Sequence, residues 1–396
     1  MKKKPTLSYN KILILLAVSL LAAMIGSVTL GRYPIGLKEL GGILASQVLE
    51  VEPFWTKTQE SLLLQHRLPR ILLAVSLLAA MIGSVTLGRY PIGLKELGGI
   101  LTSQVLEVEP FWTKTQESLL LQHRLPRILL ACMVGGSLAC AGAAYQGVFQ
   151  NPMAAPDILG ASSGAAFGAA LAILLHLSGT WIMVLAFCGS ILTVMLVMFV
   201  AARAKGKRVL GLILAGIMVS SLISSGTSLI KLVADPEDQL PAITYWLMGS
   251  LNGTSPKDVW FALVPMFLGL APLFLLRWRI NLLTLGDEEA RTMGVNARRL
   301  RTAVILSATL ITAAAVAVSG VIGWVGLVIP HLTRRMVGNN YRHLIPASIL
   351  FGSVFLLMVD NLSRNMFATE IPIGILTSFI GAPFFLYLIT REGERL

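Results

Sequence analysis

The residues that most often bind metals or catalyse reactions are few in this chain and lie far apart in the sequence. The 396 residues include five His and three Cys. The histidines that stand near span ends or within apolar sequence are His176, His331 and His343. Each lacks a Cys, Asp or Glu partner at ligand spacing, so we expect structural roles for them and no metal site. The cysteines, Cys132, Cys140 and Cys188, all lie inside apolar runs, where small buried side chains are expected.

Acidic and nucleotide-binding patterns are equally sparse. No G-x4-G-K-[ST] phosphate loop occurs, so any ATP chemistry has to come from a partner. Asp157 and Glu370 stand at the ends of apolar runs, and only Asp360 falls within one. A secondary transporter coupled to protons or sodium remains an alternative, but such proteins usually carry acidic residues within their spans. No Ser/His or His/Asp/Glu grouping indicates a membrane enzyme, and no bound cofactor is expected.

The composition indicates an integral membrane protein. Hydrophobic residues make up 55% of the chain and charged residues 13%, whereas soluble domains carry about 25% charged residues. The net charge of +12 does not indicate nucleic-acid binding, because the Lys and Arg cluster between apolar runs, as the positive-inside rule requires. The apolar runs predict an all-α polytopic fold, with spans at 12–31, 71–89, 128–149, 158–177, 181–202, 209–233, 258–276, 303–319, 321–337, 344–361 and 372–390.

An almost exact internal repeat accounts for one of these spans. Residues Ile14 to Ala74 match Ile71 to Ala131 at an offset of 57, and the two copies differ only at Ala45 and Thr102. Architectural repeats diverge in sequence, so this one indicates a recent duplication or an assembly artefact. Removing one 57-residue unit from 396 leaves 339 residues. We therefore expect residues 1–70 to be a supernumerary helix and loop that copies 71–127, and residues 71–396 to form the main domain.

The distribution of positive charge supports about ten spans instead of eleven. Basic clusters stand at both termini and after the spans 181–202, 258–276 and 321–337. All of them are cytoplasmic only if one copy of the repeated span is left out. We prefer the arrangement in which 71–89 takes the first-helix position and 12–31 is displaced, although an inserted 71–126 is the other possibility. The predicted location is the cytoplasmic membrane, crossed many times.

The strongest local pattern follows the span at 128–149. Gln146, Asn151 and Pro152 place amides and a proline near a helix break. Gly160, Gly164 and Gly168 then repeat at four-residue spacing, which allows close helix packing. A broken helix at membrane depth also commonly lines a transport pathway. These six residues are therefore predicted to serve helix packing or the translocation pathway.

Several stretches in order resemble one family of membrane proteins. They are Arg124-Leu-Pro-Arg127, Gln146-x4-Asn151-Pro-Met-Ala-x-Pro156-x-x-Leu-Gly160, Tyr245-Trp-Leu-Met-Gly-Ser250, Leu285-Gly-Asp-Glu-Glu-Ala290-x-x-Met-Gly-Val295, Gly320-Val-Ile-Gly-Trp-Val-Gly326, Pro330-His-x-x-Arg334, Glu370-Ile-Pro-Ile-Gly374 and Gly381-Ala-Pro-Phe-Phe385. Together they cover about residues 71–396 and resemble the permease subunits of type II ABC importers, which take up iron-siderophore, haem and cobalamin-type compounds. The 57-residue duplication is a departure from that family's pattern.

The resemblance implies a homodimer in the membrane lipid, with about ten transmembrane helices per subunit, two ATP-binding ABC subunits below it and an extracytoplasmic substrate-binding protein outside. It implies that the chain is a transport subunit instead of an enzyme, with ferric siderophore as the first expected cargo. Arg124, Arg127 and Arg364 are predicted to dock the binding protein through bidentate pairs with carboxylates. The residues predicted to couple to the ATPase are Gly286, Asp287, Glu288, Glu289, Ala290, Arg291 and Gly294.

Overall fold

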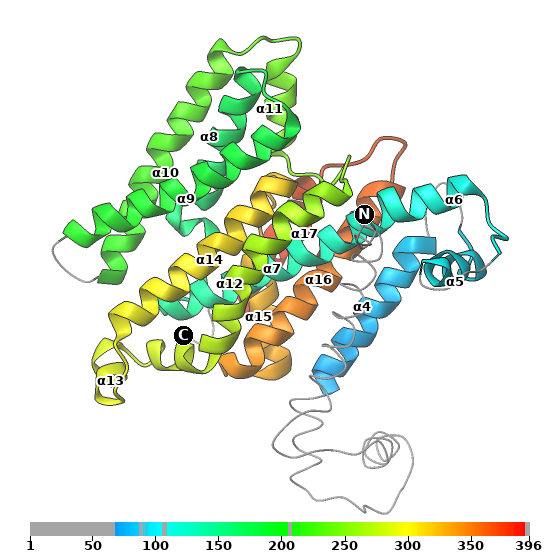
Figure 1. Ribbon diagram of the computed structural model, residues 1–396. Coiled ribbons are helices and arrows are strands. Elements are labelled where there is room, and N and C mark those ends of the chain that lie inside the picture. Colours follow the sequence, from blue (N-terminus) through cyan, green and yellow to red (C-terminus); the bar gives the residue numbers. More distant parts are fainter. Residues whose placement is uncertain (1–67, 87–89, 91, 105–108, 205–207, 393–396) are drawn as a thin grey trace, which may run out of the picture. The chain divides into compact units, whose positions relative to one another are not determined.

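The computed structural model describes residues 68–86, 90, 92–104, 109–204 and 208–392. Every regular element within these residues is a helix, which confirms the all-α prediction (Figure 1). The chain divides into two compact units, residues 1–129 and 130–396. The predicted span 12–31 and the first copy of the repeat, up to residue 67, lie outside the described residues.

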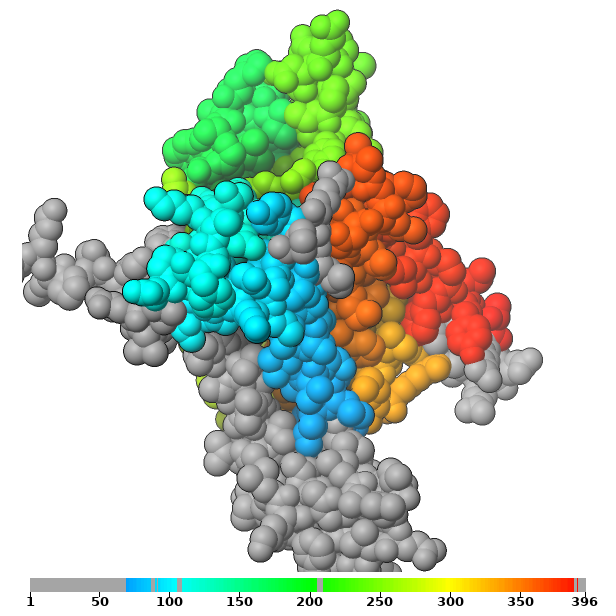
Figure 2. Space-filling view, turned by 90° about the vertical axis from the view of Figure 1, so that its right-hand side faces the viewer, coloured from blue at the N-terminus to red at the C-terminus, as the bar shows by residue number. Residues whose placement is uncertain are grey.

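The described part of the first unit holds three α-helices and a π-helical turn. They are α4 (Leu68–Thr86), α5 (Leu94–Ser103), α6 (Lys114–Ser118) and η2 (Leu119–Arg124), which continues into α7 (Leu125–Phe149). The start of α6 is fixed by a capping box, in which the Thr113 hydroxyl accepts from the Gln116 amide at 3.2 Å and the Gln116 side chain accepts from the Thr113 amide at 2.9 Å. Figure 2 shows α4 in blue beside the cyan segment that follows it.

The second unit contains the remaining elements. They are η3 (Pro156–Leu159), α8 (Ala161–Leu174), α9 (Gly179–Arg203), α10 (Arg208–Val233), α11 (Gln239–Leu247), α12 (Pro256–Leu283), α13 (Asp287–Thr292), α14 (Ala297–Ser319), α15 (Val325–Val337), α16 (Tyr341–Asn365) and α17 (Ile373–Glu392). Helices α8, α9 and α10 pack together, and α11 lies on α8 (Figure 1). Helix α14 contacts both α9 and α12, while α15, α16 and α17 form a second group, of which α16 and α17 appear orange and red in Figure 2.

The part of α7 from residue 130 onward lies in the core of this unit. A Cβ added to Gly135 would lie 2.2 Å from the carbonyl oxygen of Gly352 in α16, and one added to Gly142 would lie 1.8 Å from the carbonyl oxygen of Gly326 in α15. The absence of side chains therefore brings the helix backbones into direct contact. Lipid gives little hydrophobic drive for helix association, so this close van der Waals packing is what holds the helices together.

The ten predicted spans from 71–89 onward each overlap an α-helix within the described residues, although residues 87–89 of the first of them lie outside those residues. Seven of these helices are long and apolar enough to cross a membrane, namely α4, α7, α9, α10, α12, α14 and α16. The apolar helices at 161–174 and 373–387 are shorter. The multi-pass architecture is therefore confirmed, whereas the number of complete crossings stays a prediction.

The predicted span at 321–337 is wrong at its start. Helix α14 ends at Ser319, and α15 begins only at Val325. Between them Gly320 has a φ of 66° and Trp324 a φ of 70°, a backbone region that right-handed helices never use. The 13 residues of α15 rise only about 20 Å at 1.5 Å per residue, against roughly 30 Å of hydrocarbon. The chain is thus interrupted at this point, as in the broken helices of many transporters.

Candidate functional site

Four serines form a polar face on α10. Ser221, Ser224, Ser225 and Ser228 are all exposed, and their spacing of three, one and three residues places them on one side of the helix. The Ser225 hydroxyl donates to the carbonyl of Ser221 at 3.0 Å, and Ser228 donates to Ser224 at 3.1 Å. We call these four residues the serine face. Sequence reasoning missed it, although the helical spacing of the four serines was a readable signal.

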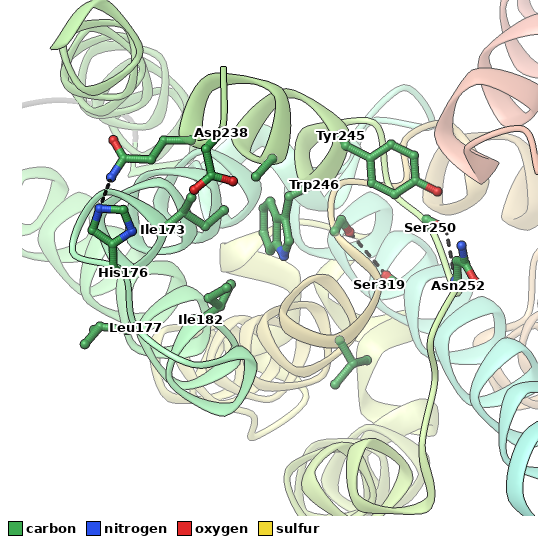
Figure 3. A pocket seen from close by; sticks show the side chains of 14 residues that line it. Ile173, His176, Leu177, Ile182, Asp238, Tyr245, Trp246, Ser250, Asn252 and Ser319 are labelled. Carbon is green, nitrogen blue, oxygen red and sulfur yellow. Dashed lines mark hydrogen bonds between the residues drawn. The ribbon is translucent and has the colours of Figure 1, made fainter. Parts of the chain in front are cut away.

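A cavity of about 550 Å³ lies next to α11, on the side predicted to be external. Its lining includes His176, Asp238, Trp246, Ser250 and Asn252. Figure 3 shows Trp246 in the middle of this lining, with His176 and Asp238 to one side and Ser250 and Asn252 to the other. The volume is typical of small-molecule sites, and polar groups converge on it together with aromatic rings.

The side of this cavity at the α8–α9 turn is held by Gln239. The side-chain oxygen of Gln239 accepts a hydrogen bond from the backbone amide of Asp235 at 3.0 Å. Its side-chain nitrogen donates to the backbone carbonyl of Leu174, also at 3.0 Å. These two backbone contacts fix the orientation of the side-chain amide. The same nitrogen lies 2.9 Å from Nε2 of His176, which must therefore act as the acceptor. His176 thus connects two elements, in agreement with the expected structural role.

A second cavity of about 670 Å³ lies beside the first and is mainly apolar. Its lining residues are Leu247, Met248, Val321, Gly323, Gly374, Ile375, Ser378, Phe379, Ala382 and Pro383. The two cavities meet the same two chain segments, since Trp246 and Gly320 line the first, and Leu247 and Val321 line the second. The two cavities therefore share a boundary along these two segments.

That boundary is formed by three glycines, Gly249, Gly320 and Gly374, which we call the glycine joint. A Cβ on Gly320 would lie 2.3 Å from the carbonyl oxygen of Trp246, and one on Gly374 would lie 2.3 Å from that of Met248. The Gly374 amide donates to the Met248 carbonyl at 3.1 Å. The end of α11, the α14–α15 connection and the start of α17 thus converge through backbone contacts that only glycine permits.

The residues predicted for helix packing or the pathway fall into two environments. Gln146 is 2% exposed, its side-chain oxygen accepts a hydrogen bond from Arg334 of α15, and Arg334 also donates to the Tyr341 hydroxyl at 3.0 Å. Asn151 and Pro152 are exposed in the connection after α7. The structure thus buries Gln146 in a polar network between helices and leaves the other two accessible.

The three spaced glycines lie where α8 meets its neighbours. A Cβ on Gly164 would lie 2.4 Å from the carbonyl oxygen of Gly189, and one on Gly168 would lie 2.1 Å from that of Leu185, both in α9. Gly160 has a φ of 75° and lies against Ser220 of α10. Their observed environment is close helix packing.

The arginines predicted to dock a binding protein are not free surface charges. Arg124 and Arg127 are 6% and 8% exposed, and the Arg124 guanidinium donates to the carbonyls of Val85 and Tyr90. Because Val85 stands in the last turn of α4, this contact satisfies a helix-terminal carbonyl with a cation, which the helix dipole favours. The docking role of both residues stays a prediction.

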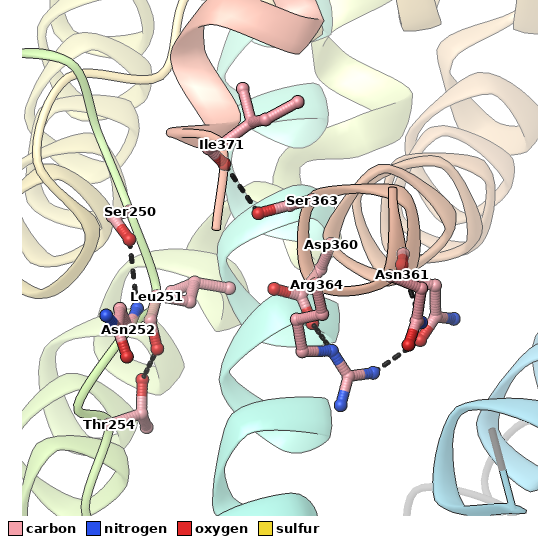
Figure 4. A network of polar contacts seen from close by, with 10 residues as sticks. Ser250, Leu251, Asn252, Thr254, Asp360, Asn361, Ser363, Arg364 and Ile371 are labelled. Atoms are coloured by element: carbon pink, nitrogen blue, oxygen red, sulfur yellow. Dashed lines mark hydrogen bonds and ion pairs between the residues drawn. The ribbon is translucent and has the colours of Figure 1, made fainter. Parts of the chain in front are cut away.

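Arg364 forms an ion pair within its own helix. Its Nε lies 3.2 Å from Oδ2 of Asp360, which is fully buried, and the guanidinium also donates to the side chain of Asn361 (Figure 4). One helical turn separates Asp360 from Arg364, which brings the two side chains together. Docking by Arg364 would have to compete with this pair and likewise stays a prediction.

The predicted coupling segment is a short helix with an exposed outer surface. Gly286, at a φ of 122°, precedes α13, and Gly294, at 77°, follows it. Ala290 is fully buried and anchors the inner side, while the outer side exposes Glu288, Glu289 and Arg291. Leu285 and Met293 are also exposed, at 53% and 58%. The two glycines thus bracket a mixed apolar and charged surface suited to a protein partner.

Within the part of the chain that the structure describes, no three His, Cys, Asp or Glu side chains come together to hold a metal ion. Among these residues Cys132 and Cys140 are buried free thiols, and Cys188 is exposed. The expected absence of a bound metal or cofactor stays a prediction.

Comparison with known proteins gives a consistent family. Residues 76–391 match the FecCD transport family. The chain is similar to the molybdate import system permease protein MolB of Haemophilus influenzae, with 40% identity over 82% of this chain and 97% of that protein. It is 43% identical to an iron chelatin transport system permease protein of Helicobacter pylori, over 69% of this chain and 82% of that protein.

A solved structure of a metal-chelate type ABC transporter in an inward-facing conformation matches with a TM-score of 0.73 and 38% identity, covering 82% of this chain and 99% of that one. The family match covers both cavities, the serine face and α13. The family, together with the long apolar helices, places the protein in the cytoplasmic membrane as a multi-pass protein. The chain therefore belongs to the FecCD transport family, as a membrane permease subunit of an ABC importer.

Proposed function

We propose that this permease carries a bulky metal chelate of low charge, with ferric siderophore first and haem or cobalamin-type chelates next. The observation that carries the proposal is the lining of the two cavities beside the glycine joint. Among the described residues, neither lining contains a Lys or Arg, and the two linings together contain one carboxylate, Asp238. The larger cavity is mainly apolar, which favours a large, weakly charged cargo over a small ion.

Molybdate is the cargo named for one relative, and it is the competing substrate. A small oxyanion needs cationic side chains or converging amide donors to replace its hydration. Among the described residues, the cavity linings supply no cationic Lys or Arg, and Asp238 would repel an anion. The electrostatics of the cavities therefore support the chelate.

The serine face supplies the route beyond the cavities in this proposal. Hydroxyls that bond to their own helix backbone still present oxygen lone pairs to a passing solute, and four of them on one face give α10 a polar surface within an apolar helix. The pathway would then run along the axis of a homodimer. Cargo would arrive from an extracytoplasmic binding protein, and ATP would be hydrolysed by two separate subunits that contact α13.

The buried carboxylate of α16 does not favour coupling to an ion gradient. Asp360 is the buried acidic residue of α16, and its carboxylate is paired with Arg364 at 3.2 Å. A carboxylate held by a fixed cation is poorly suited to load and release protons or sodium. This pairing argues against ion coupling through Asp360.

Residues 1–70 are, in the same proposal, a supernumerary copy. Deleting residues 14–70 joins Leu13 to Ile71 and restores the local sequence at the junction, because Ile14 and Ile71 begin identical stretches. The 339-residue product keeps α4 from Ile71 onward, with Lys11, Ile12 and Leu13 in place of Leu68, Pro69 and Arg70, and it keeps the other described helices. We expect it to transport at least as well as the full chain.

The test is uptake by a permease-null strain that carries the cognate ATPase and binding protein. Labelled ferric siderophores, haem, cobalamin and molybdate are supplied to cells with the full chain or with the 339-residue version. Import of a chelate and not of molybdate supports the proposal. Import of molybdate alone overturns the cargo assignment, and loss of uptake in the short version alone shows that the repeat is required.

A further inference from the structure

The coupling helix α13 is too short to be held in place by its own hydrogen bonds. It has six residues, whereas isolated helices in water need roughly 12 or more to persist. Ala290 anchors one side, and the first residue of the helix, Asp287, makes a salt bridge to Arg301. The two guanidinium nitrogens of Arg301 donate to the two carboxylate oxygens of Asp287 at 2.6 and 3.1 Å. This bidentate pair fixes both the position and the orientation of the Asp287 side chain.

Arg301 is unusual among the basic residues of this end of the molecule because it is only 2% exposed. Arg298 and Arg299, on the same helix α14, are exposed. Burial of a guanidinium costs solvation free energy, and it is tolerated when a carboxylate compensates the charge. The Asp287 side chain is 42% exposed, so the pair is buried on its arginine side alone, and this burial distinguishes it from an ion pair between two solvated side chains.

Arg301 links α13 to two helices that are distant from it in the sequence, α9 and α10. Arg301 lines a cavity of about 40 Å³ together with Met198, Ala201 and Ala202 of α9 and Leu212 of α10. Its Nε has no hydrogen-bond partner among the described residues. The cavity is about large enough for one water molecule, which would satisfy this donor. One side chain thus reaches from the first turn of α13 to the ends of α9 and α10 that are predicted to be cytoplasmic.

We propose that Arg301 is a positioning residue that transmits movement of α13 to α9 and α10, and through α10 to the serine face. When α13 moves, Asp287 moves with it. Because two hydrogen bonds join the carboxylate to the guanidinium, the two groups cannot rotate freely against each other, and the buried guanidinium of Arg301 moves as well. Lysine could not do the same, because a single ammonium gives one point contact and turns freely. The inference rests on the proposed contact of α13 with the ATPase.

The test is the amount of cargo transported per ATP hydrolysed, in proteoliposomes containing the permease, its ATPase subunits and the loaded binding protein. The main variant is the double substitution Asp287→Asn with Arg301→Met, which removes the pair without leaving a buried charge. Arg301→Lys keeps the charge and removes the bidentate geometry. Arg299→Met, on the same helix and exposed, is the matched control.

We expect both the double variant and Arg301→Lys to keep their ATPase subunits through purification and to transport about tenfold less cargo per ATP, since altered coupling typically changes such ratios several-fold. Arg299→Met should match the unsubstituted protein. An unchanged ratio in the double variant overturns the proposal. Loss of the ATPase subunits from the double variant, with the control intact, also overturns it, because the pair would then only fold the docking surface.

The result does not depend on which cargo is correct. The ratio is measured with whichever compound the unsubstituted protein imports, so molybdate transport would overturn the chelate assignment and leave this test in place.

Discussion

Helices α7 and α10 have 25 and 26 residues and are similarly apolar, yet their places in the molecule are opposite. In the most apolar stretch of the helix that includes α7, 94% of residues are buried, against 22% for α10. Hydropathy alone therefore does not decide which helix becomes the core. The two helices differ in how their small residues are placed: Gly135 and Gly142 of α7 meet the backbones of other helices, whereas the four serines of α10 remain exposed.

The largest difference in stability is expected when a methyl group is added to one glycine in each helix. Gly142→Ala in α7 would place a Cβ 1.8 Å from a backbone oxygen of α15, which cannot move without separating the helices. Gly211→Ala in α10 would place its Cβ 3.2 Å from the Cβ of Ala204. We expect the first to destabilise the protein by about 3 kcal/mol or more. The second should change stability by no more than about 1 kcal/mol, because Ala favours helix more than Gly and the exposed Ala204 has only to shift slightly to relieve the contact.

The measurement can use the thiols of α7. Cys132 and Cys140 are buried and become reactive only when the core opens, so a thiol-reactive dye reports unfolding on heating. Cys188 is exposed and is replaced by Ser in all proteins compared. Equal melting temperatures for the two alanine variants would show that the glycines of α7 are not what holds the core.

The second test concerns transport instead of stability. Ser221→Leu with Ser224→Leu makes the serine face apolar and bulky, and we expect uptake to fall about tenfold or more with an unchanged melting temperature. Leu222→Ala with Leu229→Ala changes two exposed apolar residues that flank this face and serves as the control, because it leaves all four serines in place. Normal uptake by the double leucine variant would remove the serine face from the pathway.

The sequence predicted the helices well because an apolar run of sufficient length has one stable form in lipid. It predicted α13 because Gly286 and Gly294 bracket a polar segment. It could not predict the start of α15, since the sequence from Gly320 to Trp324 is as apolar as a span and only the observed backbone reveals the interruption. It also could not predict the burial of Arg124 or the pairing of Arg301, because both depend on carbonyls or carboxylates brought close by tertiary folding.

The smallest expected effects come from removing one hydroxyl group from each of the two helices and comparing the loss of stability. The Tyr145 hydroxyl of α7 lies 2.9 Å from the Thr309 hydroxyl of α14, in the buried core. Tyr145→Phe should cost about 1 kcal/mol, since it removes a hydrogen bond between helices where no water can replace it. Ser225→Ala in α10 removes a bond only to the backbone of its own helix, at an exposed site, so we expect a change within about 0.5 kcal/mol. Both are read from the same dye-monitored melting in the Cys188→Ser background. If Ser225→Ala cost as much as Tyr145→Phe, α10 would have to be packed against a partner helix in the assembled protein, and the serine face would be a subunit contact instead of a pathway.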